Sequence, residues 1–384
     1  MPLRSPLLAA LLLAAASVCR LGAVPYGAGD HDVSEYMMGS VTVNIIFPES
    51  SASSPDTEDW TAFRKASVES SIRAAMDWWA AREPEARLSF VYNVTTQNTD
   101  YEPISCYASA APPPGGCSEG DWIGDIMTKM GYSGSDYFEQ VYAYDNAMRL
   151  TYGTDWAFTI FVADSFMDGD GAFPDGYFAY TYMGGPFMVL TYDNGDYGIS
   201  GMSAVCAHET GHVFYALDEY AESGCATTER AGYFNAPNLN CQNGGTSEQC
   251  IMRGQLAPYD TPVVCNNTRL MLGWKDVSPA NGVPDIVDLT PTTALTAYSP
   301  DPTTDNTPTY YGIAHSTAVY PNANQYGAPA MRFYYETPPP IKDISVLRIA
   351  AVEYQADAGA WQQASPRDSG FDSVVDSFTF TITT

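Results

Sequence analysis

Two of the four histidines in this chain stand four residues apart, and a glutamate follows the first of them. His208, Glu209 and His212 form the pattern His-Glu-x-x-His. Residues i and i+4 share one face of a helix, so both imidazoles can bind the same zinc ion. Zinc lowers the pKa of a bound water to about 7, and Glu209 is placed to take its proton as a general base. The pattern predicts hydrolysis with one catalytic Zn2+; the alternative is a helix whose histidines only pack.

A catalytic zinc site needs a third protein ligand. The other two histidines lie near the N-terminus and in the C-terminal part, so an acid after the motif is the better candidate. Asp218 and Glu219 come first, with Glu222 and Glu229 behind them. A straight helix would carry Asp218 about 9 Å along its axis from His212, so the chain must turn soon after His212. The spacing leaves the choice between these acids open.

Residues 208–220 (HETGHVFYALDEY) resemble the zinc helix of the metzincins. They are most similar to secreted bacterial metallopeptidases with an HExGHxF…DEY pattern, including IgA-peptidase-like enzymes. The resemblance covers about residues 33–275. It implies an α/β (α+β) catalytic domain with a mixed twisted sheet and a zinc helix, a protein or peptide substrate, and Asp218 as the third zinc ligand, with Glu219 as the alternative.

The same resemblance assigns two further residues. Met252, in the segment Cys-Ile-Met-Arg, is similar to the Met-turn below the metzincin zinc site. The tyrosine that the family carries two residues after this methionine is absent, since Gly254 stands there, and Tyr220 would take over its role of polarising the scissile carbonyl group and so stabilising the transition state. One departure is Tyr215, which stands where the family has a glycine; a bulky residue is strained at positive φ, so the turn toward Asp218 has to be built differently.

A second group of acids precedes the zinc motif. Aspartate and glycine alternate from residue 167 to 176 and again near 193. Carboxylate and carbonyl oxygens are the ligands that Ca2+ prefers, and the place of this loop is similar to the calcium loop of matrixin-type metzincins. We expect a structural calcium ion here; the alternative is a solvated loop. The candidate ligands are Asp168, Asp170, Asp175 and Asp193.

These side chains need strands and helices to position them. Apolar runs and helical periodicity predict both kinds of element before the zinc helix. The predicted strands cover residues 41–47, 87–95, 156–163, 177–182 and 187–192, and the predicted helices cover 60–82, 121–130, 137–152 and 202–216. The strand at 177–182 is expected at the edge of the sheet, where an extended peptide could pair with it.

The composition changes after residue 274. Short alternating runs separated by Pro, Thr and Asp are typical of a β-sandwich of the immunoglobulin or fibronectin-III kind. The predicted strands include 330–335, 344–350, 352–355 and 378–382. We therefore expect a catalytic domain at residues 24–280 and an all-β sandwich at 281–384, which could bind a surface or glycan target.

The N-terminus has the pattern of a secretory signal. It predicts a signal peptide at residues 1–23, with a basic residue, an apolar run from 7 to 18 and small residues near 23; the run is too short to span a bilayer.

Export to an oxidising compartment permits disulfides between the remaining cysteines. The spacing suggests three short loops and leaves Cys206 as a buried thiol; the pairs are Cys106–Cys117, Cys225–Cys241 and Cys250–Cys265.

Charge limits the possible partners. The chain has 17 Lys and Arg against 45 Asp and Glu, a net charge of −28. Such a surface repels phosphates, which argues against nucleic acid and against anionic membranes as partners.

Taken together, the zinc motif, the resemblance and the signal pattern predict a secreted, monomeric zinc endopeptidase. The competing prediction is a secreted adhesin, binding glycan or protein, that uses the zinc domain as a scaffold.

Overall fold

The computed structural model describes residues 24–51, 59–108, 111–274, 291–300, 303–319, 343–356 and 359–383. The predicted signal peptide and the predicted domain boundary at 280/281 lie outside these residues. The predicted strand at 330–335 lies outside them as well.

A five-stranded mixed sheet forms the centre of the first part of the chain. Its order is β2-β1-β3-β5-β4, and all neighbours run parallel except β4, which is antiparallel to β5. The mixed α/β class predicted from the sequence is therefore confirmed. The strands are β1 (Ser40–Ser50), β2 (Ser89–Thr99), β3 (Trp156–Ala163), β4 (Ala179–Thr181) and β5 (Phe187–Thr191).

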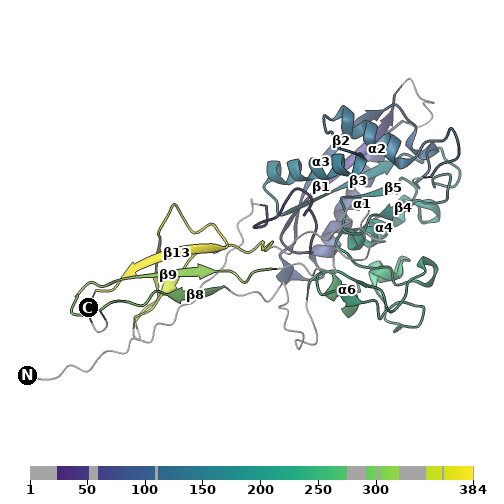
Figure 1. Ribbon diagram of the computed structural model, residues 1–384. Helices are drawn as coiled ribbons and strands as arrows, with labels where there is room; N and C mark the ends of the chain where they lie inside the picture. The colour runs from purple at the N-terminus through teal and green to yellow at the C-terminus, as the bar shows by residue number, and fades with distance from the viewer. Residues whose placement is uncertain are drawn as a thin grey trace, which may run out of the picture.

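Helices cover both faces of this sheet (Figure 1). One core contains the buried faces of α1 (Ala62–Ala80) and α4 (Gly198–Val213), and the other contains those of α2 (Glu119–Lys129) and α3 (Tyr137–Tyr152). Alternation along β3 explains the two cores, since Ile160 faces the first and Phe161 the second. The α4 helix is thereby held against α1 and the sheet.

The segment after α4 is largely irregular. It contains β6 (Arg230–Ala231), β7 (Ala236–Pro237), α5 (Ala257–Asp260) and α6 (Asn266–Met271), together with the 3-10 helix η5 (Ile251–Arg253). Two of the three predicted disulfides are present, Cys106–Cys117 and Cys225–Cys241.

The third predicted disulfide is wrong. Cys250 and Cys265 are free and buried, as is Cys206. The Cys265 thiol donates a hydrogen bond to the Glu219 carboxylate at 2.9 Å, and a disulfide sulfur has no proton to donate. The environment of the pair is that of two thiols.

Antiparallel strands form the last part of the chain. A four-stranded sheet has the order β12-β13-β9-β8, and β10 pairs with β11. Their core includes Tyr354, Phe378 and Phe380. The strands are β8 (Thr292–Leu295), β9 (Thr309–His315), β10 (Glu353–Tyr354), β11 (Gln362–Gln363), β12 (Ser365–Pro366) and β13 (Val375–Thr381).

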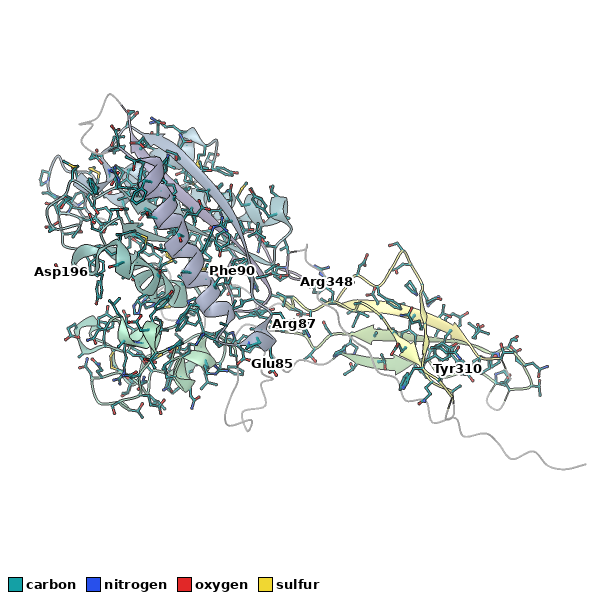
Figure 2. All side chains as sticks on the ribbon, turned by 180° about the vertical axis from the view of Figure 1, so that it is seen from behind. Glu85, Arg87, Phe90, Asp196, Tyr310 and Arg348 are labelled. Carbon is teal, nitrogen blue, oxygen red and sulfur yellow. A yellow bond between two sulfur atoms is a disulfide. The ribbon has the colours of Figure 1, made fainter. Side chains whose placement is uncertain are left out.

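The stretch predicted as a strand at 344–350 is not one. Ile344, Val346 and Leu347 are buried in the core that contains α1 and α4. Arg348 follows them where the antiparallel sheet meets the α/β part, and its guanidinium donates to the Val24 carbonyl at 2.8 Å (Figure 2). Part of the predicted second domain thus completes the core of the first.

Across the described ranges, no helix is both long and apolar enough to cross a lipid bilayer.

Candidate metal centre

The last turns of α4 carry the His-Glu-x-x-His residues. His208, Glu209 and His212 are all buried, and the two histidine Nε2 atoms lie 3.2 Å apart. The predicted helix extends to residue 216, but α4 ends at Val213. The predicted pairing of the histidines on one helix face is confirmed.

The chain turns immediately after His212, at Tyr215. Tyr215 has φ +69°, the left-handed conformation that a glycine would adopt without strain. The backbone N–H groups of Tyr215 and Ala216 donate to the carbonyls of His212 and Gly211. The Tyr215 ring is buried against Gly184, where a Cβ atom would lie 2.3 Å from the ring. Packing of a large ring therefore stabilises a turn that the residue type opposes.

This turn brings Asp218 back to the histidines. Its Oδ1 atom lies 3.0 Å from His208 Nε2 and 3.2 Å from His212 Nε2. Glu219 points elsewhere, and its carboxylate accepts hydrogen bonds from Asn240 and Cys265. Of the four acids that the spacing left open, Asp218 is the one that joins the histidines.

The hydrogen bonds of the imidazoles suit a metal site. The Nδ1 atoms of His208 and His212 lie 2.9 and 2.7 Å from the carbonyl oxygens of Ile251 and Ala216. A carbonyl only accepts, so each Nδ1 donates and each Nε2 is left with a lone pair in the neutral ring. Asp218 Oδ1 is buried and, within the described residues, has no hydrogen-bond donor. Three electron-pair donors thus face one another, which fits a bound cation.

Electrostatics show what takes the place of a metal ion when none is bound. Burial alone would lower the pKa of His212, but the adjacent charge of Asp218 raises that pKa to about 9. Burial would likewise raise the pKa of Asp218, but the two imidazoles hold it well below its usual range. The site therefore favours positive charge, which protons or a metal ion can supply.

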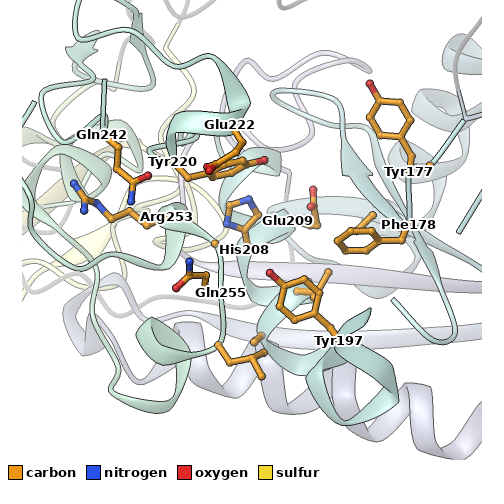
Figure 3. A pocket seen from close by; sticks show the side chains of 16 residues that line it. Tyr177, Phe178, Tyr197, His208, Glu209, Tyr220, Glu222, Gln242, Arg253 and Gln255 are labelled. Carbon is orange, nitrogen blue, oxygen red and sulfur yellow. The ribbon is translucent and has the colours of Figure 1, made fainter. Parts of the chain in front are cut away.

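Glu209 opens into a pocket of about 500 Å³ beside the histidines. Its Oε2 atom accepts a hydrogen bond from Thr181 Oγ1 on β4 at 2.7 Å. Figure 3 shows Glu209 and His208 between the rings of Tyr220 and Tyr197. The general-base candidate is thus accessible from the pocket and held by the edge strand.

Met252 lies beneath this arrangement, on η5. Its sulfur is so close to Gly211 that a Cβ atom there would lie 2.5 Å from it. Its carbonyl accepts a hydrogen bond from the Glu219 N–H at 2.8 Å. The Met-turn candidate therefore packs against α4 beside the histidines.

Tyr220 lines the pocket, with its ring centroid 6.1 Å from that of His208. Burial, and then the charge of Asp218, raises the pKa of its phenol well above the ordinary value. The hydroxyl therefore keeps its proton at neutral pH and can donate a hydrogen bond into the pocket.

The four aspartates predicted for calcium do not form a compact group of ligands. In the part of the chain that the structure describes, two groups of three residues could hold a metal, and these aspartates belong to neither. Asp168 and Asp170 accept hydrogen bonds from backbone N–H groups of their own loop. Asp175 accepts from the Ala108 N–H. Asp168 and Asp170 therefore stabilise turns of their own loop, and Asp175 joins this loop to the segment at Ala108.

Sequence reasoning missed two contributors to the region. One is Thr181, whose hydroxyl positions Glu209. The other is the second group of possible ligands, Glu219, Cys250 and Cys265. No local pattern in the sequence identifies either contributor, because each depends on contacts between segments that are far apart in the chain.

Comparison of the chain with models of protein families, with curated proteins and with solved structures gives no match. Any function assigned to the chain therefore rests on its residues and their geometry.

Proposed function

We propose that this protein is a secreted zinc-dependent endopeptidase whose first part is a metzincin-like catalytic domain. The observation that carries the proposal is the convergence of His208 Nε2, His212 Nε2 and Asp218 Oδ1 within 3.2 Å of one another. Two imidazoles and one carboxylate form a three-ligand set of the kind found in catalytic zinc sites. Glu209 lies beside them in an open pocket, as a general base must.

The residues around the pocket have distinct roles in peptide hydrolysis. When bound, zinc supplies Lewis-acid polarisation of a carbonyl group and lowers the pKa of water. Glu209 accepts the proton of the attacking water and returns it to the departing amine. The Thr181 hydroxyl fixes the orientation of the Glu209 carboxylate. The Tyr220 phenol, which keeps its proton, donates a hydrogen bond to the carbonyl oxygen as negative charge develops there.

The edge strand β4 supports a peptide as the substrate. It is the outermost strand of its sheet and carries Thr181, the residue that contacts Glu209. An extended peptide that paired with β4 would have its backbone beside the general base. The antiparallel sheets of the last part could bind a surface or glycan target without taking part in the chemistry.

Variants of the pocket test this function. Glu209→Gln should keep zinc and lose about 100-fold or more of peptide hydrolysis, because the amide cannot take a proton. Glu222→Gln is the matched control, since Glu222 lines the same pocket outside the metal group. His212→Ala should lose both activity and the zinc of this site.

The measurements are zinc per chain by mass spectrometry and cleavage of a broad peptide library. Full activity in Glu209→Gln would exclude Glu209 as the base. A zinc-loaded wild type that cleaves no peptide would instead support the adhesin, with the zinc domain as its scaffold.

A further inference from the structure

A second group of ligand-type side chains lies behind the first. Glu219, Cys250 and Cys265 are buried, and one ligand atom of each lies within 4.8 Å of the others. Glu219 Oε1 is 2.9 Å from Cys265 Sγ. The Thr268 hydroxyl oxygen is 3.0 Å from Glu219 Oε1 and 3.2 Å from Cys250 Sγ. Two sulfurs and two oxygens therefore form one compact cluster.

The charge of Glu219 has no direct counter-ion. Its side chain is fully buried, and no ion pair between described residues includes it. The donors to its carboxylate are an amide, a hydroxyl and a thiol, from Asn240, Thr268 and Cys265. A buried carboxylate is costly unless a cation pairs with it or it binds a metal. The cluster is thus short of positive charge.

We propose that Glu219, Cys250 and Cys265 bind a second, structural zinc ion, with the oxygen of the Thr268 hydroxyl as the fourth ligand. Zinc binds thiolate sulfur and carboxylate oxygen, and structural zinc sites are four-coordinate and closed to solvent. Binding releases the two thiol protons to solvent, so the net charge of the cluster is unchanged, but the metal gives the Glu219 carboxylate a directly bonded cation in place of neutral donors. The proposal is independent of the catalytic function.

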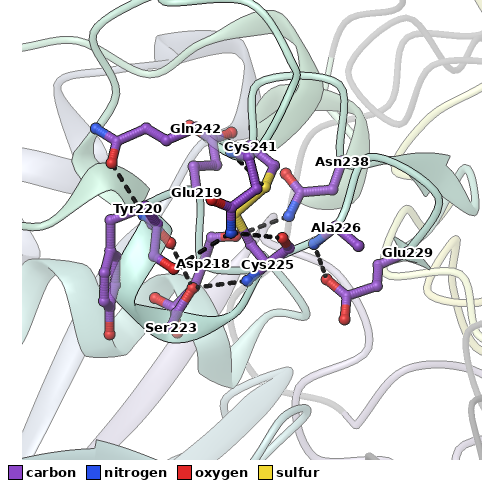
Figure 4. The surroundings of a disulfide bond; sticks show 12 residues. Asp218, Glu219, Tyr220, Ser223, Cys225, Ala226, Glu229, Asn238, Cys241 and Gln242 are labelled. Carbon is purple, nitrogen blue, oxygen red and sulfur yellow. Dashed lines mark hydrogen bonds between the residues drawn. A yellow bond between two sulfur atoms is a disulfide. The ribbon is translucent and has the colours of Figure 1, made fainter.

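The location gives such an ion a structural role. Glu219 directly follows Asp218, and Cys250 stands two residues before Met252. The backbones of the two segments are already joined by the hydrogen bond from Glu219 N–H to the Met252 carbonyl. Figure 4 shows Asp218 and Glu219 beside the Cys225–Cys241 disulfide, in the same loop region. A second ion would therefore hold the Asp218 segment against the Met252 segment.

The alternative is a Cys250–Cys265 disulfide, which the sequence spacing favoured. Its formation would remove the thiol donor from Glu219 and leave the buried carboxylate with two neutral donors. It would also give a different count of thiols, so the two possibilities can be distinguished chemically.

The experiment uses the full-length His212→Ala protein, in which the first metal site is lost. The purified protein is incubated with excess zinc, and gel filtration then removes the unbound metal. We expect one zinc per chain, with a zinc–sulfur distance of about 2.3 Å by X-ray absorption. Adding Cys265→Ser should remove that zinc. Adding Cys206→Ser is the control and should retain it, because Cys206 is a buried thiol outside the cluster.

A second measurement needs no variant. Alkylation of the denatured, unreduced wild type should modify the three cysteines that are free in the structure, Cys206, Cys250 and Cys265. Alkylation of Cys206 alone would show the disulfide and overturn the proposal. A His212→Ala protein without zinc would overturn it too, whether or not the wild type is an active peptidase.

Discussion

At the residue scale, the Thr181 hydroxyl orients the carboxylate of Glu209, the general-base candidate. Thr181 Oγ1 donates to Glu209 Oε2 at 2.7 Å, and Thr181 sits in β4 opposite Met188 of β5. Among the described residues, this is the one hydrogen bond between the Glu209 carboxylate and a side chain of β4. The hydroxyl therefore limits Glu209 to orientations that face the pocket.

Thr181→Val keeps the shape and removes the hydrogen bond. We expect kcat for peptide hydrolysis to fall about fivefold with KM and zinc content unchanged, since one hydrogen bond contributes about 1 kcal/mol. Thr181→Ser should restore kcat, because it returns the donor. Equal kcat values for the valine variant and the wild type would remove Thr181 from the positioning of Glu209.

Tyr215 makes a second prediction at this scale. Its ring is buried, and its backbone lies at φ +69°. Truncation should cost about 3–5 kcal/mol of unfolding free energy. Tyr215→Gly should be more stable than Tyr215→Ala by about 1 kcal/mol, because glycine adopts positive φ without strain. Chemical denaturation measures both. A more stable alanine variant would contradict the strain at this turn.

The sequence predicts the chemistry of individual residues better than their supports. His208, Glu209 and His212 follow from residue type and spacing, Asp218 follows from the resemblance to the metzincins, and the structure brings the three predicted ligands together. Thr181 does not follow, because a threonine in a predicted strand has no pattern that identifies its partner. The prediction of a Cys250–Cys265 disulfide was wrong for a related reason. The spacing of the two cysteines in the sequence does not show that the Glu219 carboxylate lies beside them.

At the element scale, a buried carboxylate joins the starts of two neighbouring strands. Asp155, just before β3, accepts hydrogen bonds from the N–H and hydroxyl of Ser40 in β1, at 2.8 and 2.7 Å. Burial raises the pKa of Asp155 to about 6, although both bonds lower it. The folded protein therefore keeps a proton that the unfolded chain releases at lower pH.

This difference predicts how stability depends on pH. The stabilising effect of the Asp155 proton is complete below about pH 4 and is lost as pH rises through about 6. Between pH 4 and 7 the wild type should lose up to about 3 kcal/mol of unfolding free energy relative to Asp155→Asn. Urea denaturation across this range measures the loss. A pH-independent difference in stability between the wild type and Asp155→Asn would contradict the raised pKa of Asp155.

Elements with a strong periodic pattern agree well with their predictions. The bounds of β3 and α3 match the predicted ones, and α4 differs by a few residues at each end. The apolar run at 344–350 predicts a strand, yet it forms no ladder. Its backbone groups bond instead to the Tyr36 hydroxyl and to single residues of other segments, such as Val319. Such tertiary partners are not visible in a local pattern.

At the scale of the whole molecule, one tyrosine joins segments far apart in the chain. The Tyr36 hydroxyl donates to the Ile344 carbonyl at 2.8 Å and accepts from the Val346 N–H at 3.2 Å. Its ring is fully buried and packs edge-on against Trp156. The first core is therefore closed by residues that follow most of the chain.

Tyr36→Phe should lower the unfolding free energy by about 1–3 kcal/mol, because it leaves two buried backbone groups without a partner. Tyr26→Phe is the control; its ring is half exposed, and we expect a change within about 0.5 kcal/mol. Thermal and chemical denaturation give both values. An unchanged stability for Tyr36→Phe would mean that the 344–348 segment does not stabilise the first core.

The Tyr36–Ile344 contact also has a consequence for synthesis. It spans 308 residues. At roughly 5–20 residues per second, the ribosome needs about 15–60 s to make the chain between these two partners. During that interval the first core lacks the packing of Ile344, Val346 and Leu347, because these residues have not yet been synthesised. The nascent chain is thus most exposed to proteases and to self-association late in translation, when it is already most of its final length.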